Sequence, residues 1–496
     1  MKKLAILFLF FLTISSVAQT NNILFERSFW KENPDVATLK QKISEGNSAT
    51  ALNENGFDAT VYAIIEKAND DVIKYLLTLE ENPVDKRTHD SRIYLHWAAY
   101  AGKTEIVKTL LEMGSSVSAL DSHSATPLIF AAGSGLIDAK IYDLFLANGV
   151  NLSEEKNEDG ANTLLLAAPY FKDLKETDYF TSKGISLNST DNDGNGIFNY
   201  AAKRGNIDFL KILVKNGVDY KTLNKNGGNA FLFAAQGTRG FENKLEVYNY
   251  LKSLELEPNV VTKDGYTPLH RLAYGNKDAA IFGFFLKYGA DVNQKDTDGN
   301  TPFLNATSRN NLEMVQLLSK NVKDYNLANN KGQTPIMLAT GFNSPEVVQF
   351  LLEKGGDATA KDASGNTVAS YLAESFSEKK PEDFKSKLKM LQEKGLKLNT
   401  VQADGNTLYH LAAKKNDLEL LKSISKFDIP VNATNNEGLT ALHQAAMKAE
   451  NDEMMKYLIS IGADKNAKTG FEETAFDLAS ENELLQKENV ALNFLK

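Results

Sequence analysis

A glycine recurs along this chain at nearly constant spacing, and this recurrence limits the possible folds more than any other feature. From Gly194 the in-phase glycines are Gly227, Gly265, Gly299, Gly332, Gly365, Gly405 and Gly438. The intervals between them are 33, 38, 34, 33, 33, 40 and 33 residues. A period of this size indicates one supersecondary unit copied many times, with each copy burying its apolar side against its neighbours. A chain of 496 residues can then form one long core instead of several compact domains.

One copy, residues 264–297, shows what the unit contains. Gly265 lies in a polar turn, where it can adopt a positive φ. Thr267 can cap a helix with its hydroxyl, and Pro268 suits the first helical position. Apolar residues then follow at helical spacing in two groups: Leu269, Leu272 and Ala273, then Ile281, Phe282, Phe285 and Leu286. Gly289 ends the second group, so each unit is predicted to be a turn, two helices and a return loop.

This pattern resembles the ankyrin repeat, whose units begin Gly-x-Thr-Pro-Leu-His and end Leu-Leu…Gly-Ala-Asp-Val-Asn. Further matches are His96 to Ala99 with Leu110-Leu111, Thr301-Pro302, Thr334-Pro335 with Leu351-Leu352, and Thr440 to His443 with Gly462-Ala463-Asp464. The resemblance implies an all-α ankyrin-repeat solenoid of about a dozen units over residues 53–469, forming a curved superhelix. Capping helices are expected over residues 19–52 and 470–496. Leu110, Leu286 and Leu351 are predicted core positions.

Three units depart from the pattern, near residues 158–192, 226–263 and 364–403. The first has an extra residue within 160–163 and is expected to have a poor second helix. The second has an insertion at 237–243, and the third has a charged insertion at 375–383. These segments are expected to be kinks in the stack or docking loops.

Residues 1–18 have the pattern of a secretory signal peptide. Lys2 and Lys3 precede an apolar run from Leu4 to Leu12, and Ser16-Val17-Ala18 resembles a cleavage site. The alternative is a membrane anchor, but this run is shorter than the about 20 apolar residues that a span needs. We therefore expect a periplasmic or secreted protein, and the signal and its junction indicate a Gram-negative bacterium. The sequence has no cysteine, so packing must stabilise the fold without disulfides.

The overall charge argues against nucleic acid as a partner. The net charge is −9; without Lys2 and Lys3, 53 of the 55 basic residues remain against 64 acidic residues, which gives −11. General binding to nucleic acid needs many phosphate contacts from lysine and arginine. No later segment is apolar enough to predict stable membrane insertion. Leu478, Leu485 and Leu492 are spaced by seven, but too briefly for a coiled-coil dimer, so we expect a monomer.

The sequence predicts no catalytic residues, no metal site and no cofactor. Asp191, Asp193 and Asn195 match half of a calcium loop, but Ala202 stands where a bidentate glutamate is required. His89 and His123 lie one unit apart, but a zinc site needs three or four ligands, so a solvated pair is the favoured reading.

Four histidines share one position of the repeat: His96, His270, His410 and His443. The family resemblance implies that each imidazole bonds to the backbone and to the neighbouring capping hydroxyl. Their predicted role is structural.

In ankyrin-like units the turn tips and the ends of the first helices line one concave face. The matching positions that we predict to bind a partner are Tyr100, Tyr170, Arg204, Tyr266, Tyr274, Arg309, Phe342, Lys414 and Lys415. Tyrosine and arginine are enriched in interface hot spots. Two alternatives remain: cations that answer the helix dipole, and tyrosines that pack on the next unit.

The sequence therefore predicts a non-enzymatic, exported scaffold that binds another protein, with an acidic surface favoured because the predicted face is richer in basic residues than the chain. The alternative is an enzyme or a receptor for a small ligand or polymer, with its site in the irregular units. An enzyme or receptor should have a deep pocket with polar groups beside Tyr170, Phe241 or Phe376. A scaffold should have a long shallow groove.

Overall fold

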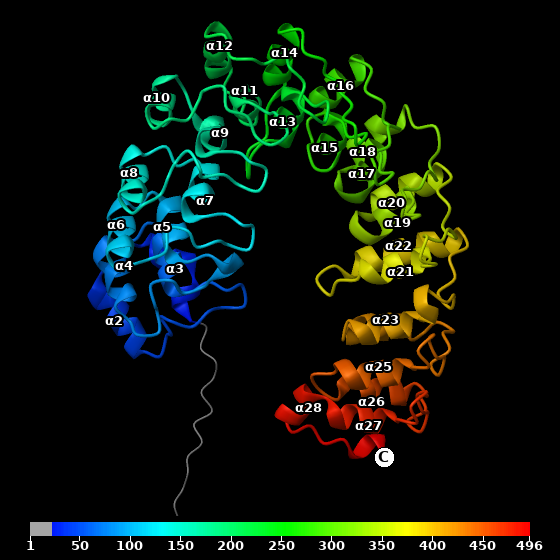
Figure 1. Cartoon of the computed structure of the whole chain (residues 1–496). Helices are drawn as coiled ribbons and strands as arrows, with labels where there is room; N and C mark the ends of the chain where they lie inside the picture. The colour runs from blue at the N-terminus through cyan, green and yellow to red at the C-terminus, as the bar shows by residue number, and fades with distance from the viewer. Residues whose placement is uncertain (1–21) are drawn as a thin grey trace, which may run out of the picture. The chain divides into compact units, whose positions relative to one another are not determined.

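Paired helices follow one another along the whole described part of the chain (Figure 1). The computed structural model describes residues 22–496, and the predicted signal peptide lies outside them. Within these residues no β-strand forms, and only isolated bridges occur. Contacts divide the chain into a first unit that ends at Tyr220 and a second unit, Lys221–Lys496. The prediction of an all-α, ankyrin-type repeat array is confirmed.

The first unit begins with two short helices, α1 (Arg27–Lys31) and α2 (Val36–Ser44). Phe29, Trp30 and Leu39 are buried there, whereas Ile43 is half-buried. Five helix pairs follow: α3 (Ala59–Ile65) and α4 (Asp70–Leu77), α5 (Tyr94–Ala101) and α6 (Thr104–Glu112), α7 (Pro127–Gly133) and α8 (Ala139–Ala147), α9 (Thr163–Ala167) and α10 (Lys175–Ser182), and α11 (Ile197–Ala202) and α12 (Ile207–Lys215).

The second unit has eight pairs: α13 (Ala230–Gln236) and α14 (Leu245–Ser253), α15 (Pro268–Ala273) and α16 (Ala279–Lys287), α17 (Pro302–Arg309) and α18 (Leu312–Ser319), α19 (Pro335–Phe342) and α20 (Pro345–Glu353), α21 (Val368–Glu374) and α22 (Pro381–Glu393), α23 (Leu408–Lys414) and α24 (Leu418–Ile424), α25 (Ala441–Lys448) and α26 (Glu453–Ser460), and α27 (Ala475–Glu481) and α28 (Glu483–Lys487). Over 470–496, where one capping helix was expected, the chain thus forms a last short pair.

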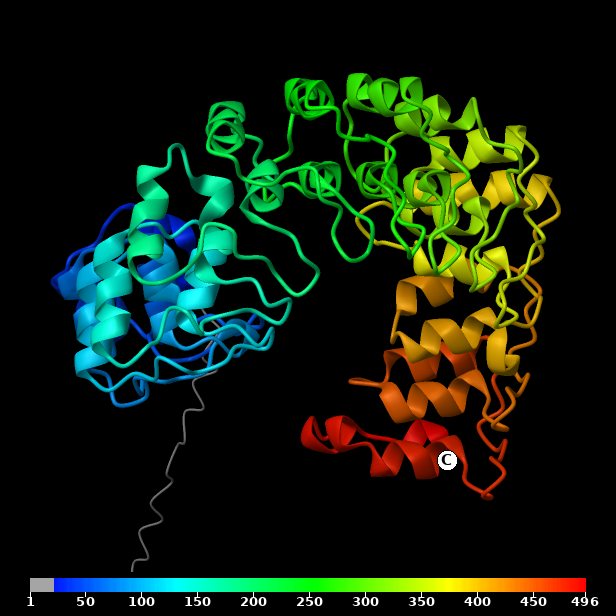
Figure 2. The same ribbon diagram turned by 45° about the horizontal axis from the view of Figure 1, so that its top comes forward.

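Each unit consists of two helical layers with turns extending from one side (Figures 1 and 2). The odd-numbered first helices pack on one another, as in α5 on α7 and α17 on α19. The even-numbered second helices form the other layer, as in α16 on α18. Alanine pairs such as Ala98-Ala99 are fully buried, because small side chains let the first helices approach closely.

Backbone hydrogen bonds join many of the turns to the next one. The Thr297 amide donates to the Asp264 carbonyl at 2.8 Å, and the Asn330 amide donates to the Asp298 carbonyl at 2.9 Å. Gly265 lies in this ladder at φ 72°, so its predicted positive φ is confirmed. These turns are therefore linked directly from copy to copy.

Asparagine side chains form a second link between neighbouring copies. The Asn310 amide donates to the carbonyls of Ala273 and Asn276 at 3.0 and 2.9 Å, across the end of the preceding first helix. Asn343 and Asn482 repeat this pattern one and several copies later. Carbonyls at a helix end lack a partner within their own helix, and here the next copy supplies one.

The irregular copies of the repeat, near residues 158–192, 226–263 and 364–403, differ from the pattern in specific places. After Gly160 the irregularity falls in the first helix: α9 ends at Ala167 and gives way to a 3₁₀ turn, because Pro169 cannot continue an α-helix. The predicted weak second helix is instead a full helix, α10. The charged insertion lengthens α22 to 13 residues, and its Lys387 donates to the Thr340 carbonyl at 2.9 Å in place of an asparagine. Burial lowers the pKa of this lysine to about 8.

The prediction that Leu286 belongs to the core was wrong. Leu286 is half-buried, whereas Phe282 and Phe285 on the same helix are fully buried. Leu110 and Leu351 are fully buried, as predicted. Three buried phenylalanines lie on α16, and one of them, Phe285, takes the position that Leu351 has on α20.

Candidate partner-binding surface

Large exposed apolar side chains recur at two adjacent positions of the repeat, at the end of the first helix. Tyr100 is 44% exposed at the end of α5, Tyr274 is 48% exposed after α15, Phe342 is 49% exposed at the end of α19, and Met447 is 38% exposed in α25. Each follows two mostly buried residues that pack on the neighbouring first helix, which is why the next side chain points away from it. Within each unit, exposed side chains at the ends of first helices offer contact area to a partner.

Tyr100 stands on an aromatic base in the first unit. Its ring stacks on Phe130 at 5.5 Å and meets the edge of Trp97 at 6.3 Å. The Arg92 guanidinium lies 4.2 Å from the centre of the Phe130 ring and forms an ion pair with Asp121 at 2.9 Å. These contacts hold Tyr100 in one orientation, so little entropy is lost when it binds. Sequence reasoning missed Phe130 and Arg92, because only their neighbours in space show their role.

Four of the predicted residues meet as two tyrosine–arginine pairs, one in each unit. The Arg204 guanidinium lies 4.9 Å from the centre of the Tyr170 ring. In the second unit the Arg309 guanidinium lies 5.6 Å from the centre of the Tyr274 ring. Such cation–π contacts orient both groups and keep the charge at the surface. In each pair the two residues come from neighbouring copies of the repeat.

Other predicted residues already have partners within the protein. Tyr266 is half-buried and stacks on His270 at 5.2 Å, so less of its surface is available than a turn-tip position suggested. Burial raises the pKa of Tyr266, and the nearby Arg271 charge opposes this rise. Lys415 forms an ion pair with Glu374 at 3.0 Å, whereas Lys414 is exposed. The basic excess of this surface is therefore smaller than its sequence indicated.

The four in-phase histidines bond to backbone as predicted, and three of them also contact the capping hydroxyl; His96 does not, because its cap residue is Ile93. Nδ1 of His270 accepts from the Thr267 amide at 3.2 Å and lies 2.8 Å from the Thr267 hydroxyl. Nε2 lies 3.2 Å from the Asn300 carbonyl of the next turn. His96, His410 and His443 make the equivalent contacts to the next copy. Burial is the main cause that lowers the pKa of each, to about 4 for His96.

We expect the first unit to lose stability as the pH falls from about 6.5 toward about 4. Because the pKa of His96 is about 4 in the folded protein and 6.5 without burial, the unfolded chain binds more protons in this window. The loss attributable to His96 is roughly 1–3 kcal/mol. Urea unfolding of wild type and His96→Gln at several pH values measures it, since glutamine does not titrate. Equal pH slopes for the two proteins would contradict the expectation.

Residues 22–496 contain no group of three or more histidine, cysteine, aspartate or glutamate side chains that could hold a metal ion. His89 instead bonds to the Asn55 carbonyl at 2.8 Å and stacks on Phe57, and His123 lies beside the Ser122 hydroxyl. Over the same residues no helix combines the length and the apolar character that a bilayer crossing requires.

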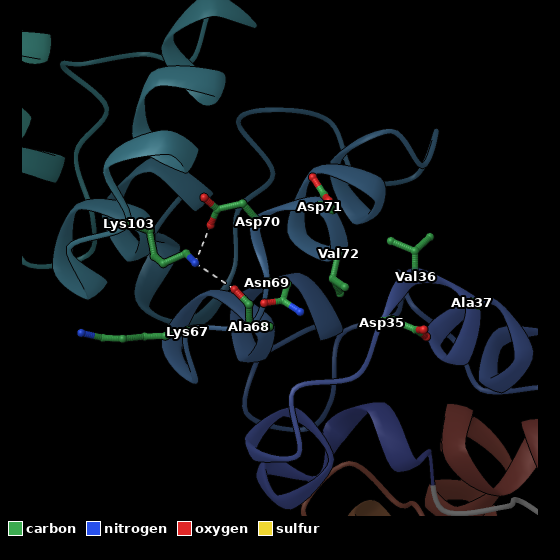
Figure 3. A pocket seen from close by; sticks show the side chains of 10 residues that line it. All are labelled: Asp35, Val36, Ala37, Lys67, Ala68, Asn69, Asp70, Asp71, Val72 and Lys103. Carbon is green, nitrogen blue, oxygen red and sulfur yellow. Dashed lines mark hydrogen bonds and ion pairs between the residues drawn. The ribbon is translucent and has the colours of Figure 1, made fainter.

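A polar hollow of about 630 Å³ lies where α2, α4 and α6 begin (Figure 3). Lys103 reaches across it to the Ala68 carbonyl at 2.8 Å and pairs with Asp70 at 2.5 Å. The Asp35 carboxylate caps α2 by accepting from the Thr38 amide. Lys103, Asp70 and Asp35 are therefore engaged in contacts that hold the helices here. A second cavity, of about 240 Å³, lies beside the 237–243 insertion.

Comparison with known proteins agrees with this architecture. The family profile described as "Ankyrin repeats (3 copies)" matches residues 31–121, 61–155, 95–191, 198–282, 272–362 and 379–469. The chain belongs to the ankyrin-repeat family. Repeats of this family generally mediate protein–protein interaction.

Similar proteins share only parts of their length with this chain. A stretch is 28% identical to Palmitoyltransferase AKR1 of Lachancea kluyveri, over 33% of this chain and 22% of that protein. Another is 29% identical to putative ankyrin repeat protein FPV031 of Fowlpox virus, over 32% and 48%. A third is 27% identical to human transient receptor potential cation channel subfamily A member 1, over 55% and 28%. The chain thus spans less than half of each of these relatives.

Proposed function

We propose that this protein is an exported, non-enzymatic scaffold that binds a protein partner through the ends of its first helices. The observation that carries the proposal is the exposure of Tyr100, Tyr274 and Phe342 at the ends of first helices, where each is nearly half exposed. Ordered aromatic side chains offer a large contact area at a low entropy cost. Membership of a family whose repeats mediate protein contacts supports the same reading.

The proposed site of action is the bacterial periplasm or the outside medium. Residues 1–18 supply the argument, through their charged start, apolar run and small-residue junction. An acidic patch on the partner is the favoured complement, because Arg204, Arg309 and Lys414 extend from the same ends of helices. Raising the salt concentration should then weaken the complex, and a flat response would reject this electrostatic part alone.

The binding surface can be tested with a matched pair of variants. We expect Tyr100→Ala/Tyr274→Ala/Phe342→Ala to reduce recovery of the partner from an envelope fraction at least roughly tenfold, because hot-spot aromatics carry most of the binding energy. The measurement is a pull-down with the full chain, read by mass spectrometry.

The control is Met113→Ala/Ile137→Ala/Tyr288→Ala, which removes side chains of similar exposure at other positions, beside the second helices. It should leave recovery unchanged. Equal losses in both triple variants, or no loss in the first, would contradict binding through the ends of the first helices.

A further inference from the structure

The insertion in the unit after Gly227 builds one wall of a cavity. The first helix α13 ends at Gln236, and Gly237 turns the chain at φ 63°. A Cβ at this glycine would lie 2.5 Å from the Phe241 carbonyl oxygen, so only glycine allows the chain to fold back so closely. Thr238 and Phe241 then exchange backbone hydrogen bonds of 2.9 and 3.2 Å. The result is a small closed loop between α13 and α14.

Buried side chains hold this loop in place. The Asn243 amide donates to the Ala234 carbonyl at 3.0 Å, and Asn243 is 3% exposed. The Tyr248 hydroxyl on α14 donates to the same carbonyl at 3.2 Å. The loop is therefore fixed from two sides, and the cavity that it encloses with α15 is preformed. Its volume is about 240 Å³, and Ala234, Ala235 and Leu272 supply apolar lining.

Two opposite charges line this cavity without pairing with one another. Glu242 enters from the loop and Arg271 from α15, and within residues 22–496 neither forms an ion pair with any side chain. The Asn276 amide donates to Oε2 of Glu242 at 3.0 Å. Asn276 is 6% exposed and is itself held, because its Oδ1 accepts from the Asp278 amide at 2.9 Å. A buried amide thus fixes the position of the carboxylate.

Arg271 and Glu242 have different tyrosines as neighbours. Arg271 lies near the Tyr266 phenol, where its positive charge opposes the rise of the Tyr266 pKa. Glu242 lies near the Tyr248 hydroxyl. The pKa of this hydroxyl is raised mainly by burial, and also by the negative charges of Glu242 and Asp278. The lining therefore carries one negative and one positive group on different elements, the loop and α15, and the Tyr274 ring forms part of it.

We infer that this cavity binds a small zwitterion of the amino-acid class, with its ammonium toward Glu242 and its carboxylate toward Arg271. An arginine fork pairs with a carboxylate through two hydrogen bonds, and a held carboxylate accepts strongly from an ammonium group. A ligand with one charge would leave the opposite protein charge uncompensated. The ligand's own side chain lies against Tyr274 and Leu272. Nucleotides and oligosaccharides exceed the volume, since pockets for larger ligands start at about 300 Å³. This binding does not depend on the proposed partner.

The experiment is calorimetric titration of the full chain with free L-amino acids of small, apolar, polar and aromatic side chains. Each is paired with its N-acetyl and its carboxamide derivative, which removes one charge. We expect saturable binding of at least one free amino acid and roughly tenfold weaker binding of both of its derivatives. No saturable binding by any free amino acid, or equal binding of the derivatives, overturns the inference.

Variants locate the site. Glu242→Gln and Arg271→Met should each weaken binding roughly tenfold, because each removes one charge and keeps most of the side-chain volume. Lys244→Met removes a nearby charge that does not line the cavity, and this variant should bind as wild type does. The circular-dichroism spectrum and urea midpoint of each variant are measured alongside. Unchanged affinity in both Glu242→Gln and Arg271→Met would also overturn the inference.

Discussion

Gly265→Ala is expected to lower the free energy of unfolding of the second unit by roughly 2–4 kcal/mol, whereas Gly365→Ala costs only about 1–2 kcal/mol. Both glycines occupy the same position of the turn, at φ 72° and 92°, so an L-residue is strained at either one. The difference comes from the next copy. A Cβ at Gly265 would lie 2.2 Å from the Lys295 carbonyl oxygen, and one at Gly365 would meet nothing within 4 Å.

The clash at Gly265 acts on the turn-to-turn ladder. Backbone atoms of Lys295 cannot move away without disturbing the bond from Thr297 to the Asp264 carbonyl. Urea unfolding followed by circular dichroism measures both variants against wild type. Backbone strain at positive φ affects both variants, whereas the clash with Lys295 affects only Gly265→Ala. Gly365→Ala therefore measures the strain alone. Similar losses in the two variants would show that the ladder yields without cost and that the expectation is wrong.

Leu351→Ala is expected to destabilise the second unit by about 2–5 kcal/mol, and Leu286→Ala by roughly 1 kcal/mol or less. Leu351 is fully buried on α20, which packs against both α19 and α22, so its removal leaves a cavity between copies. Leu286 has the same side chain and lies on the equivalent second helix of its own copy, one position further along than Leu351, and it is half-buried. Both variants thus remove the same atoms from a second helix, and the burial of those atoms differs between them.

A repeat array has a particular way of showing this loss. Stability is approximately a sum over copies and their interfaces, so a cavity at α20 weakens one junction more than the rest. We expect Leu351→Ala to broaden the urea transition or split it in two, while Leu286→Ala shifts it slightly as a single step. Equal shifts with equal steepness would mean that burial at these two positions does not control stability.

The repeat architecture could be predicted because its signals are local. Turn glycines, capping threonines and prolines at the first helical position act within a few residues, and they recur in phase. Gly265, Thr267 and Pro268 occupy the predicted turn, cap and first helical position. The in-phase histidines could be assigned for the same reason, since each bonds to its own cap and to the next turn.

The sequence placed the surface residues at the correct repeat positions, but it did not predict which of them have partners within the protein. Tyr100, Tyr274 and Phe342 could be placed at the ends of first helices from the repeat phase. That Lys415 pairs with Glu374, or that Tyr266 stacks on His270, depends on side-chain reach between copies. Leu286 is half-buried because phenylalanines of its own helix occupy the core there. Which side chains fill a core depends on their packing in three dimensions.

The sequence by itself thus determined the class of fold, the turn-and-two-helix composition of each copy and which copies depart from the pattern. It did so because each copy repeats short-range rules of turn, cap and apolar spacing. Tertiary structure alone decided what the breaks become: an extended α22 anchored by Lys387, and a loop after Gly237 that closes a charged cavity with α15. These outcomes depend on contacts between residues some 30 to 50 positions apart, as in Asn276 on Glu242 and Lys387 on Thr340 (34 and 47 residues), and no local pattern encodes such distances.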